Sequence, residues 1–500
     1  MGSFCSLLVL VFSALGSSAP TGTYSPSSSV ATTSTTTGPR ASLAPAVIGY
    51  LLLDPVTGPA KLQALAANAT RLPLTRLVVS FARPDMVYIP QSRTLKHVGL
   101  GLATNTSSDY GFELLANATR QLQAGGVEVF LSVGGWNYNC FAFLYMKYSI
   151  AYFPVGPNAW KLSMYGLGSM SGCTEANQYC YVCEPPSEGT KLSDFSIFPE
   201  PSFSPTWKQA QAFVASGTGG DVPVWHPELV GGASFTDGSV TTTVPGSDLW
   251  SRVRRDPYQD LVYLAKDLNL DGIDLDYEEF WHADTFRSGT GLGPFRLDQT
   301  VYKYSAIAYD LILNIKATYP TCKLSVAASA AGAWNGPWWG GNLKGLWYFS
   351  NLWYPSITDF MMTGPNAGGI NAMTYDLSKN PTFHECPSPT LPCSLAGQVA
   401  FYLDTYHTNI SPSVRFGLEV GTPAYPDAMH DSVSQLPLTK QALNEITSSV
   451  SVLGGSGAIV WELYKDQGVA DVNASVVLQT LCRGVFGGGM ERCLGVIPRF

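Results

Sequence analysis

Three carboxylates recur at every second position in the segment Asp271 to Glu278, which reads DGIDLDYE. In an extended strand successive side chains point to opposite faces, so Asp274, Asp276 and Glu278 share one face. Alternate positions lie roughly 6 to 7 Å apart, and like charges this close in a buried row cannot all ionise. At least one carboxyl group should therefore keep its proton near neutral pH, as a general acid requires.

The opposite face of this segment carries Ile273, Leu275 and Tyr277, which need a buried partner. A calcium loop of the EF-hand type would place ligands at positions 1, 3 and 5, followed by a glycine and a glutamate at position 12. Here the oxygen ligands end within the octet and the intervening positions are apolar. An acidic loop or calcium site fits less well than a strand whose acids face a cavity, and we expect no metal or cofactor.

Apolar runs of strand length alternate along the chain with segments of helical spacing, as in repeated βα units. The predicted strands are Val47 to Leu52, Arg76 to Phe81, Val127 to Val133, Gly272 to Glu278, Lys323 to Ala328, Ile370 to Tyr375, Val414 to Val420 and Ala458 to Trp461. The predicted helices are Leu114 to Ala124, Tyr302 to Ala317, Leu395 to His407, Lys440 to Val450 and Ala474 to Val485. This α/β pattern predicts a (β/α)8 TIM barrel, in which reactive groups belong at the carboxyl ends of the strands.

Two segments interrupt the pattern. More than a hundred residues with four cysteines lie between Trp136 and Leu261, far more than one crossover requires. We interpret them as a long cysteine-containing insertion after the third strand, at about 137–260, which either binds substrate or is a disulfide-braced surface excursion. The second segment, Ala331 to Tyr354, is predicted to be an aromatic loop whose tryptophans either stack on sugar rings or pack the loop together.

The net charge of -8 and the pI of about 5.3 argue against nucleic acid or an anionic membrane surface as a partner. The apolar run Phe4 to Leu15 is too short to span a bilayer and precedes small residues, which predicts a signal peptide at 1–19 and a secreted, extracellular protein. N-myristoylation of Gly2 is the alternative. Residues 20–45, rich in Ser, Thr and Pro, predict a flexible linker before a folded region at 46–500.

Sequons and cysteines also favour a secreted glycoprotein. Five Asn-x-Ser/Thr sequons begin at Asn68, Asn105, Asn117, Asn409 and Asn473. In an oxidising compartment we expect disulfides between Cys386 and Cys393 and between Cys482 and Cys493, with two more among Cys140, Cys173, Cys180 and Cys183. The spacing of Cys180 and Cys183 could instead suggest zinc or redox chemistry, although no second pair or nearby His supports it. Cys322 should be unpaired.

The octet fits without a mismatch the Asp-Gly-x-Asp-x-Asp-x-Glu signature of family 18 glycoside hydrolases, the chitinase family, which this chain resembles. Further motifs of that family fall at the ends of other predicted strands in the expected order. They are Tyr50 in the first, Ser132-Val133-Gly134-Gly135 at the third, Met373-Thr374-Tyr375-Asp376 at the sixth and Trp461 at the eighth. The resemblance covers roughly Val47 to Val485 apart from the insertion.

The resemblance implies a role for each carboxylate of the octet. Glu278 would protonate the glycosidic oxygen and later activate water, and Asp276 would orient the 2-acetamido group of the substrate, whose carbonyl oxygen is the nucleophile. Asp274 would lie deeper and share charge or a proton with Asp276. Tyr50 and Ser132 would be its hydrogen-bond partners, while Tyr375 would donate to the acetamido oxygen.

The resemblance also implies a set of substrate-binding residues: Tyr50, Ser132, Gly134, Gly135, Trp136, Met373, Asp376 and Trp461. Met373 and Trp461 would form an apolar wall and floor, Asp376 would contact sugar hydroxyls, and the glycines would allow close backbone approach. Two departures from the family stand out. Tyr277 replaces a tryptophan that many chitinases have, and the seventh strand, ending at Val420, offers no residue that we can assign.

We therefore expect a secreted, monomeric glycosidase that cleaves β-1,4 bonds between N-acetylglucosamine units of chitin with retention of configuration. Too little chain lies between Pro423 and Gly457 for the insertion that deepens the groove of exo-type relatives, which favours endo-type cutting. One alternative is an endo-β-N-acetylglucosaminidase acting on the chitobiose core of N-glycans. A non-catalytic chitinase-like lectin is another, although such relatives usually lose the glutamate of the octet.

Overall fold

The computed structural model describes residues 43–84, 86, 88–96, 98–102, 110–135, 234–237, 240–243, 257–278, 297–334, 345–377, 394–421, 436–450, 456–465 and 472–500. All of them belong to the unit Ala41–Phe500. The predicted signal peptide and all but the last three residues of the predicted linker lie outside the described residues.

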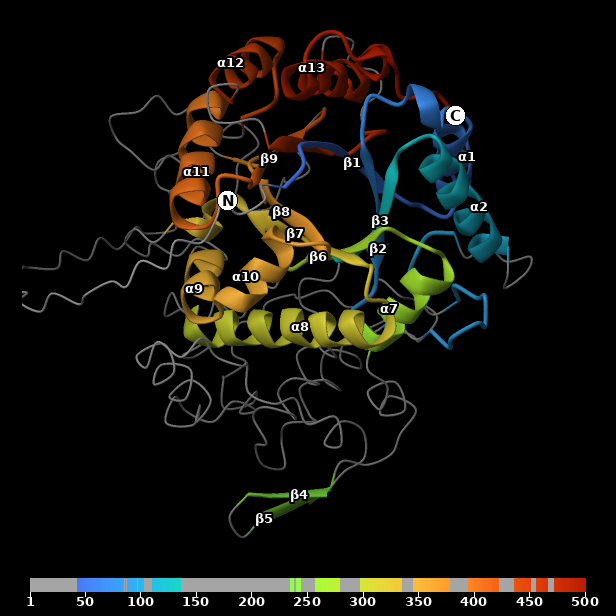
Figure 1. Ribbon diagram of the computed structural model, residues 1–500, viewed down its shortest axis with the longest axis vertical. Helices are drawn as coiled ribbons and strands as arrows, with labels where there is room; N and C mark the ends of the chain where they lie inside the picture. Colours follow the sequence, from blue (N-terminus) through green and yellow to red (C-terminus); the bar gives the residue numbers. More distant parts are fainter. Residues whose placement is uncertain are drawn as a thin grey trace, which may run out of the picture. The chain divides into compact units, whose positions relative to one another are not determined.

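Eight parallel strands close into a barrel that is surrounded by helices (Figure 1). In chain order the strands are β1 (Ala46–Leu52), β2 (Arg76–Ala82), β3 (Glu128–Gly134), β6 (Gly272–Asp276), β7 (Lys323–Ser329), β8 (Ala367–Met373), β9 (Arg415–Glu419) and β10 (Gly457–Trp461). Each pairs with the next, and β10 pairs with β1 to close the barrel. The prediction of a (β/α)8 TIM barrel is confirmed.

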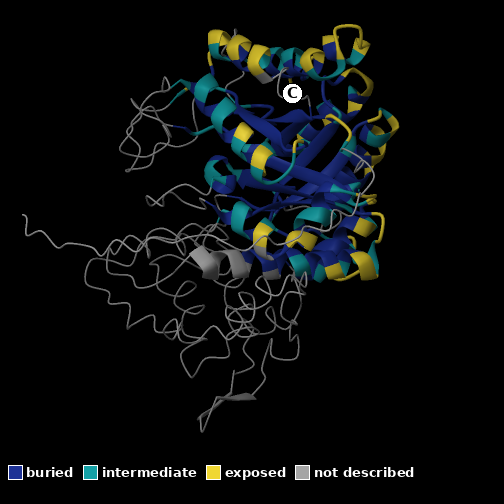
Figure 2. Ribbon diagram, turned by 60° about the vertical axis from the view of Figure 1, so that its left-hand side comes forward, coloured by how far each residue is buried: buried dark blue, intermediate teal, exposed yellow. Residues whose placement is uncertain are grey.

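The helices form the outer layer, and their outward faces are exposed while the strands are buried (Figure 2). They are α1 (Gly58–Ala67), α2 (Tyr110–Ala124), α7 (Pro257–Asp267), α8 (Leu297–Thr318), α9 (Leu346–Trp353), α10 (Pro355–Met362), α11 (Leu395–Asn409), α12 (Lys440–Val450) and α13 (Ala474–Phe486). Side-chain caps begin two of them, since Ser394 accepts from Gly397 N at 3.1 Å and Asn473 accepts from Val476 N at 3.1 Å. None of the helices described here is long and apolar enough to span a membrane.

Some predicted boundaries were wrong. The segment predicted as an aromatic loop contains α9, and Trp347 of this helix is buried, because the aromatic residues recur at a spacing that lets a helix bury one face. Helix α7 begins at Pro257 and occupies the last residues assigned to the insertion. Within that insertion β4 (Ser234–Asp237) and β5 (Val240–Thr243) form an antiparallel hairpin, and its other residues lie outside the described ranges.

The predicted disulfide between Cys482 and Cys493 is present, and Cys322 is buried and unpaired as predicted. The other predicted cysteine pairs lie outside the described residues. The disulfide joins α13 to the short helix η8 (Glu491–Leu494). Arg492 of η8 donates to the carbonyls of Leu74, Gly125 and Gly126. These bonds hold η8 against the loops that precede β2 and β3, at the amino-terminal side of the barrel.

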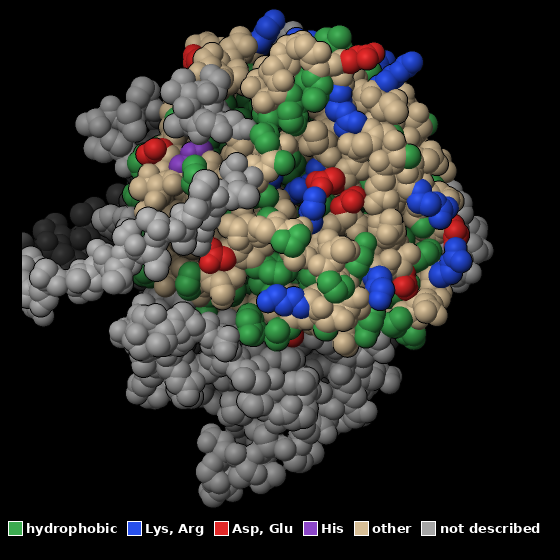
Figure 3. Space-filling view, viewed as in Figure 1, with side chains coloured by type: hydrophobic (Ala, Val, Ile, Leu, Met, Phe, Trp, Pro, Cys, Tyr) green, Lys and Arg blue, Asp and Glu red, His purple; other side chains and the backbone are tan. Residues whose placement is uncertain are grey.

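Both faces of the strands are buried, one against the helices and one inside the barrel. Ile273 and Leu275 of β6 belong to the large core between strands and helices. A separate small apolar cluster fills part of the barrel interior; its buried members are Ala46, Ile48, Tyr50, Val78, Phe130 and Ile459. The remaining interior positions are largely polar, and charged side chains also gather near the centre of the face seen in Figure 3.

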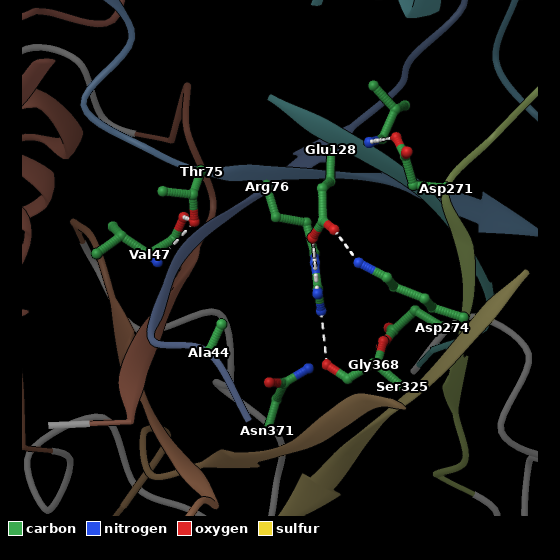
Figure 4. A network of polar contacts seen from close by, with 12 residues as sticks. Ala44, Val47, Thr75, Arg76, Glu128, Asp271, Asp274, Ser325, Gly368 and Asn371 are labelled. Atoms are coloured by element: carbon green, nitrogen blue, oxygen red, sulfur yellow. Dashed lines mark hydrogen bonds and ion pairs between the residues drawn. The ribbon is translucent and has the colours of Figure 1, made fainter. Parts of the chain in front are cut away.

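A network of charged side chains occupies the amino-terminal end of the barrel interior (Figure 4). Arg76 donates to Glu128 Oε2 at 2.8 Å through Nη2, and Lys323 pairs with the other oxygen of Glu128. Arg76 also donates to Gly368 O at 2.7 Å, as does Arg415 at 2.9 Å. Burial opposes ionisation of Glu128, but the two cations lower its pKa overall.

Replacing Glu128 with Gln should destabilise the protein, because it leaves the charge of buried Arg76 without its counter-ion. We expect a loss of about 3 kcal/mol in the free energy of unfolding, measured by urea denaturation at pH 7. The lowered pKa of Glu128 means that this difference should shrink as the pH falls and the wild-type carboxylate becomes protonated.

The double variant Glu128→Gln, Arg76→Met is the control, since it removes both charges and should be more stable than Glu128→Gln alone. If Glu128→Gln were as stable as the wild type, the network would not hold the barrel together in this way.

Candidate active site

The three acids of the octet lie at the carboxyl end of β6. Asp274 and Asp276 are buried inside the barrel, while Glu278 follows the strand and is partly exposed. Strand β6 ends at Asp276, two residues earlier than predicted. On the opposite face Tyr277 is buried beside Tyr304 of α8, with ring centroids 5.6 Å apart. Tyr277 therefore packs against a helix on the face of the segment opposite the acids.

Three hydroxyl groups surround Asp274. Tyr50 Oη and Ser132 Oγ donate to Asp274 Oδ2, both at 2.9 Å, and Ser325 Oγ donates to Asp274 Oδ1 at 2.5 Å. Burial raises the pKa of Asp274, and these hydroxyls and the charge of Arg76 act in the opposite direction. The contacts from Tyr50 and Ser132 are those that the family resemblance implies.

Asp276 and Glu278 lie close enough in the acid row for each to shift the pKa of the other. Burial, followed by the charges of Glu278 and Asp274, raises the pKa of Asp276 well above its ordinary value. Burial also raises the pKa of Glu278, to about 7, and the charge of Asp376 adds to this effect. The pair as a unit therefore holds a proton near neutral pH.

Gly134 and Gly135 bring β3 close to the backbone of β6. Both have left-handed backbone angles, with φ of 103° and 76°, and Gly135 N donates to Asp276 O at 2.8 Å. A Cβ on Gly134 would lie 2.2 Å from Asp276 O. The glycines therefore allow the backbone of β3 to come close to the backbone of Asp276. This contact holds the acid row against β3.

Tyr375 and Asp376 follow β8, which ends at Met373 rather than at Tyr375 as predicted. The strand ends because Thr374 N turns back to Ala372 O at 2.9 Å. The buried Thr374 hydroxyl then donates to Gly417 O at 2.8 Å and accepts from Gly417 N at 3.0 Å, which ties this turn to β9. Asp376 has a left-handed backbone, with φ of 52°, which is uncommon for a residue other than glycine.

Tyr375 remains a hydrogen-bond donor throughout the neutral range. Burial and the charges of Asp276, Glu278, Asp376 and Glu419 raise the pKa of its hydroxyl well above the ordinary value. Its ring lies against Gly417, where a Cβ would come within 2.9 Å of Tyr375 Cε1. The absence of a side chain at position 417 thus makes room for the ring inside the barrel.

The apolar side of the site is built around Trp461 at the end of β10. Its ring lies 5.6 Å from that of Phe81 in a stacked arrangement and 6.0 Å from that of Tyr50. Met373 packs against the same interior cluster. These aromatic and thioether groups form a hydrophobic floor next to the acids.

The structure adds three residues that the sequence analysis did not assign to the site: Ser325, Glu419 and Lys465. Ser325 pairs in register with Asp274 across β6 and β7, so the alternation of inward positions could have indicated it. Glu419 ends the seventh barrel strand, where no residue was assigned. Trp136 lies outside the described residues, and no group of His, Cys, Asp or Glu within the described part could hold a metal ion.

No family model matches this chain, and no curated protein matches it. Among solved structures it is similar to a GH18 chitinase from Pseudoalteromonas aurantia, at 13% identity and a TM-score of 0.42, over 88% of this chain and 99% of that chain. A chitinase from Bacteroides thetaiotaomicron is similar at 12% identity and a TM-score of 0.38, over 89% and 98% of the two chains. A morphinone reductase is similar at 9% identity and a TM-score of 0.35, over 84% and 83%.

Removing one hydroxyl donor should weaken the support of Asp274. We expect Ser325→Ala to lower the free energy of unfolding by roughly 1 to 3 kcal/mol, because a buried carboxylate loses a hydrogen bond. Urea denaturation at pH 7 would measure this. Ser80→Ala is the matched control, since Ser80 Oγ is buried and has no hydrogen-bond partner in the described structure. Equal losses in the two variants would contradict the expectation.

Proposed function

We propose that this protein is a glycoside hydrolase that cleaves β-1,4 bonds between N-acetylglucosamine units of chitin by a retaining, substrate-assisted mechanism. The observation that supports this most strongly is the row of Asp274, Asp276 and Glu278 at the carboxyl end of a (β/α)8 barrel, where burial raises the pKa of each acid. Active sites of this fold lie at that end. A retained proton next to a buried carboxyl row suits general acid catalysis.

In this proposal Glu278 protonates the glycosidic oxygen. In the reactive state the retained proton is on Glu278, and the carboxylate of Asp276 accepts the N–H of the 2-acetamido group. The acetamido carbonyl oxygen attacks the anomeric carbon, forming a cyclic oxazolinium intermediate as the C–O bond to the leaving sugar breaks. Glu278, now ionised, takes a proton from the water that opens this ring, which restores the acid.

Two further groups complete this chemistry. Tyr375 keeps its proton and donates to the acetamido oxygen, and Asp274 remains below as a fixed acceptor held by its three hydroxyl donors. Trp461 and Met373 provide the apolar floor beneath the ring of the sugar, and Asp376 binds its hydroxyl groups. Donors that face developing charge in a buried site contribute strongly to catalysis.

We further propose that the protein is secreted and acts in an oxidising compartment. The Cys482–Cys493 disulfide supports this, because such bonds persist mainly outside the cytosol. Among the sequons, the side chain of Asn117 on α2 is exposed, whereas Asn473 caps α13 with its side-chain oxygen. We also propose that the protein cuts within the polymer chain. The connection between β9 and β10 is too short for the insertion that deepens the groove of exo-type relatives.

Replacing Glu278 with Gln should remove turnover of chitin oligomers, because the amide cannot donate a proton to the leaving oxygen. We expect a fall in kcat of roughly 10²- to 10⁴-fold, measured by product release, with oligomer affinity largely kept. Wild-type protein should be assayed in parallel on chitin oligomers, colloidal chitin and a denatured N-glycoprotein.

Each substrate separates one alternative from the proposal. Turnover of the glycoprotein alone would assign an endo-β-N-acetylglucosaminidase, and binding without turnover would assign a lectin. A cellulose oligomer, which lacks the acetamido group, is the negative control; its efficient hydrolysis would contradict the substrate-assisted mechanism.

The rate should fall on the alkaline side of neutrality. The general acid must be protonated, and the pKa of Glu278 is raised to about 7, so kcat/KM should decrease about tenfold per pH unit above that value. A pH profile on a soluble chitin oligomer would measure this, with thermal unfolding at each pH to exclude denaturation. A rate that stays constant up to pH 9 would rule out this assignment of the acid.

A further inference from the structure

The pentapeptide Ala-Asn-Ala-Thr-Arg occurs twice in the chain, at 67–71 and at 116–120. Each copy contains an Asn-Ala-Thr sequon, the acceptor sequence for N-linked glycosylation, which begins at Asn68 in the first copy and at Asn117 in the second. The proposed active site uses neither copy. Because the two acceptor sequences are identical, any difference between them in the folded protein comes from their surroundings.

Asn117 lies in the middle of α2, a helix of the outer layer (Figure 1). Ala116 and Ala118 on either side of it are buried. Asn117 itself is exposed, as are Arg120 and Gln121 one turn further on, so these residues form the solvent face of the helix. The side-chain oxygen of Asn117 accepts a hydrogen bond from Arg120. This contact does not involve Nδ2, the atom to which a glycan is attached.

The fold uses the corresponding nitrogen atom at two other sequons. Asn68 is the C-cap of α1 and is partly buried, and its Nδ2 donates to Ala64 O in the last turn of that helix at 2.9 Å. Asn409 is also partly buried, and its Nδ2 donates to Ala333 O at 3.0 Å. A sugar on either nitrogen would have to fit beside a backbone carbonyl inside the fold. Asn117 imposes no such conflict.

The hydroxyl group of Thr119 completes the sequon of Asn117 but makes no hydrogen bond in the described structure. Thr119 is 0% exposed, and its Oγ1 atom is buried without a partner. Burying a hydroxyl in this way costs free energy that valine, which has nearly the same shape, would not cost. Folding also hides this hydroxyl from an enzyme that must recognise it. Transfer of a glycan to Asn117 must therefore precede the folding of α2.

We propose that Asn117 carries an N-linked glycan and that the Thr119 hydroxyl serves the transfer of this glycan, not the folded structure. This inference rests on the proposed secretion. The glycan donor is an oligosaccharide joined to a lipid diphosphate. The bond between sugar C1 and the diphosphate oxygen breaks, C1 joins Nδ2 of Asn117, and the proton that Nδ2 loses goes to the diphosphate. The glycan then lies outside the helix layer, whereas the proposed catalytic acids lie inside the barrel.

Glycopeptide mass spectrometry tests the site on the full chain, expressed in eukaryotic cells and purified from the medium. We expect a glycan on most molecules at Asn117 and on several-fold fewer at Asn68. Asn117→Gln and Thr119→Val should each remove the glycan at 117, whereas Thr119→Ser, which keeps a hydroxyl, should retain it. An unmodified Asn117 in the secreted wild-type protein would overturn the proposal, and so would an intact glycan at 117 in Thr119→Val.

Thermal unfolding of unglycosylated protein, produced in bacteria, measures the buried hydroxyl separately. Thr119→Val should raise Tm by roughly 1 to 3 °C, because it removes a polar group that has no partner. Thr70→Val is the matched control, since it changes the same position of the other pentapeptide at an exposed threonine and should not raise Tm. An unchanged or lower Tm in Thr119→Val would mean that the hydroxyl supports the fold, which would contradict its assignment to glycan transfer.

Failure of this site and failure of the proposed function give different results. If the chain does not reach the medium, the proposed secretion fails, and a chain with an established signal peptide in place of residues 1–19 still shows whether Asn117 accepts a glycan. If the secreted chain carries a glycan at Asn117 but does not cleave chitin, the hydrolase proposal fails and the glycan site stands. In an active protein, Asn117→Gln should leave kcat on chitin oligomers unchanged.

Discussion

Burying carboxyl groups inside a barrel is the constraint on which the rest of this structure depends. An ionised carboxylate loses its water shell there and must be paired, hydrogen-bonded or protonated. Asp274 receives three hydroxyl donors, and the pKa values of Asp276 and Glu278 are raised so that this pair retains a proton near neutral pH. Strand register provides these partners, because Ser132 and Ser325 pair with Asp274 from the strands on either side. The geometry of the acids thus follows from the closure of the sheet.

The two ends of the barrel interior shift the pKa values of their buried carboxyl groups in opposite directions. At the amino-terminal end Arg76 and Lys323 surround Glu128, and its pKa is lowered despite burial. At the carboxyl end burial and neighbouring acids raise the pKa values of Asp276, Glu278 and Glu419. Phe130 lies between the two ends, with the Arg76 guanidinium 3.9 Å from its ring centroid. One end therefore holds fixed charges, and the other holds protons that can be transferred.

The sequence predicted the barrel well because each of the eight strands was visible as a segment of strand length that is rich in apolar residues, and most are followed by a segment of helical spacing. The acid row follows from the alternation of residues within one segment, whereas the contacts of Asp274 with Tyr50 and Ser132, which lie 224 and 142 positions away, were expected from the family resemblance. Prediction was poorer where neither a local pattern nor a motif of the resembled family marks the partner. Ser325 is one serine among many, and the pairing of Glu419 with Lys465 exists only because the ends of β9 and β10 meet. Helix α9 was missed because its aromatic residues resembled a sugar-binding loop.

Buried oxygen atoms of the site that lack a hydrogen-bond donor restrict the chemistry of its ligand. Asp276 Oδ1 and Asp376 Oδ1 are both buried without a hydrogen-bond partner in the described structure, and such atoms carry a desolvation penalty until a donor reaches them. A cation would satisfy the charge but would lower the pKa of the neighbouring acids and release the proton that the pair retains. An uncharged ligand with N–H and O–H groups and an apolar ring face satisfies both oxygens, covers Trp461 and leaves that proton in place. An N-acetylated sugar has all of these features, and the polar groups that the barrel leaves unsatisfied thus favour it over a charged or purely apolar ligand.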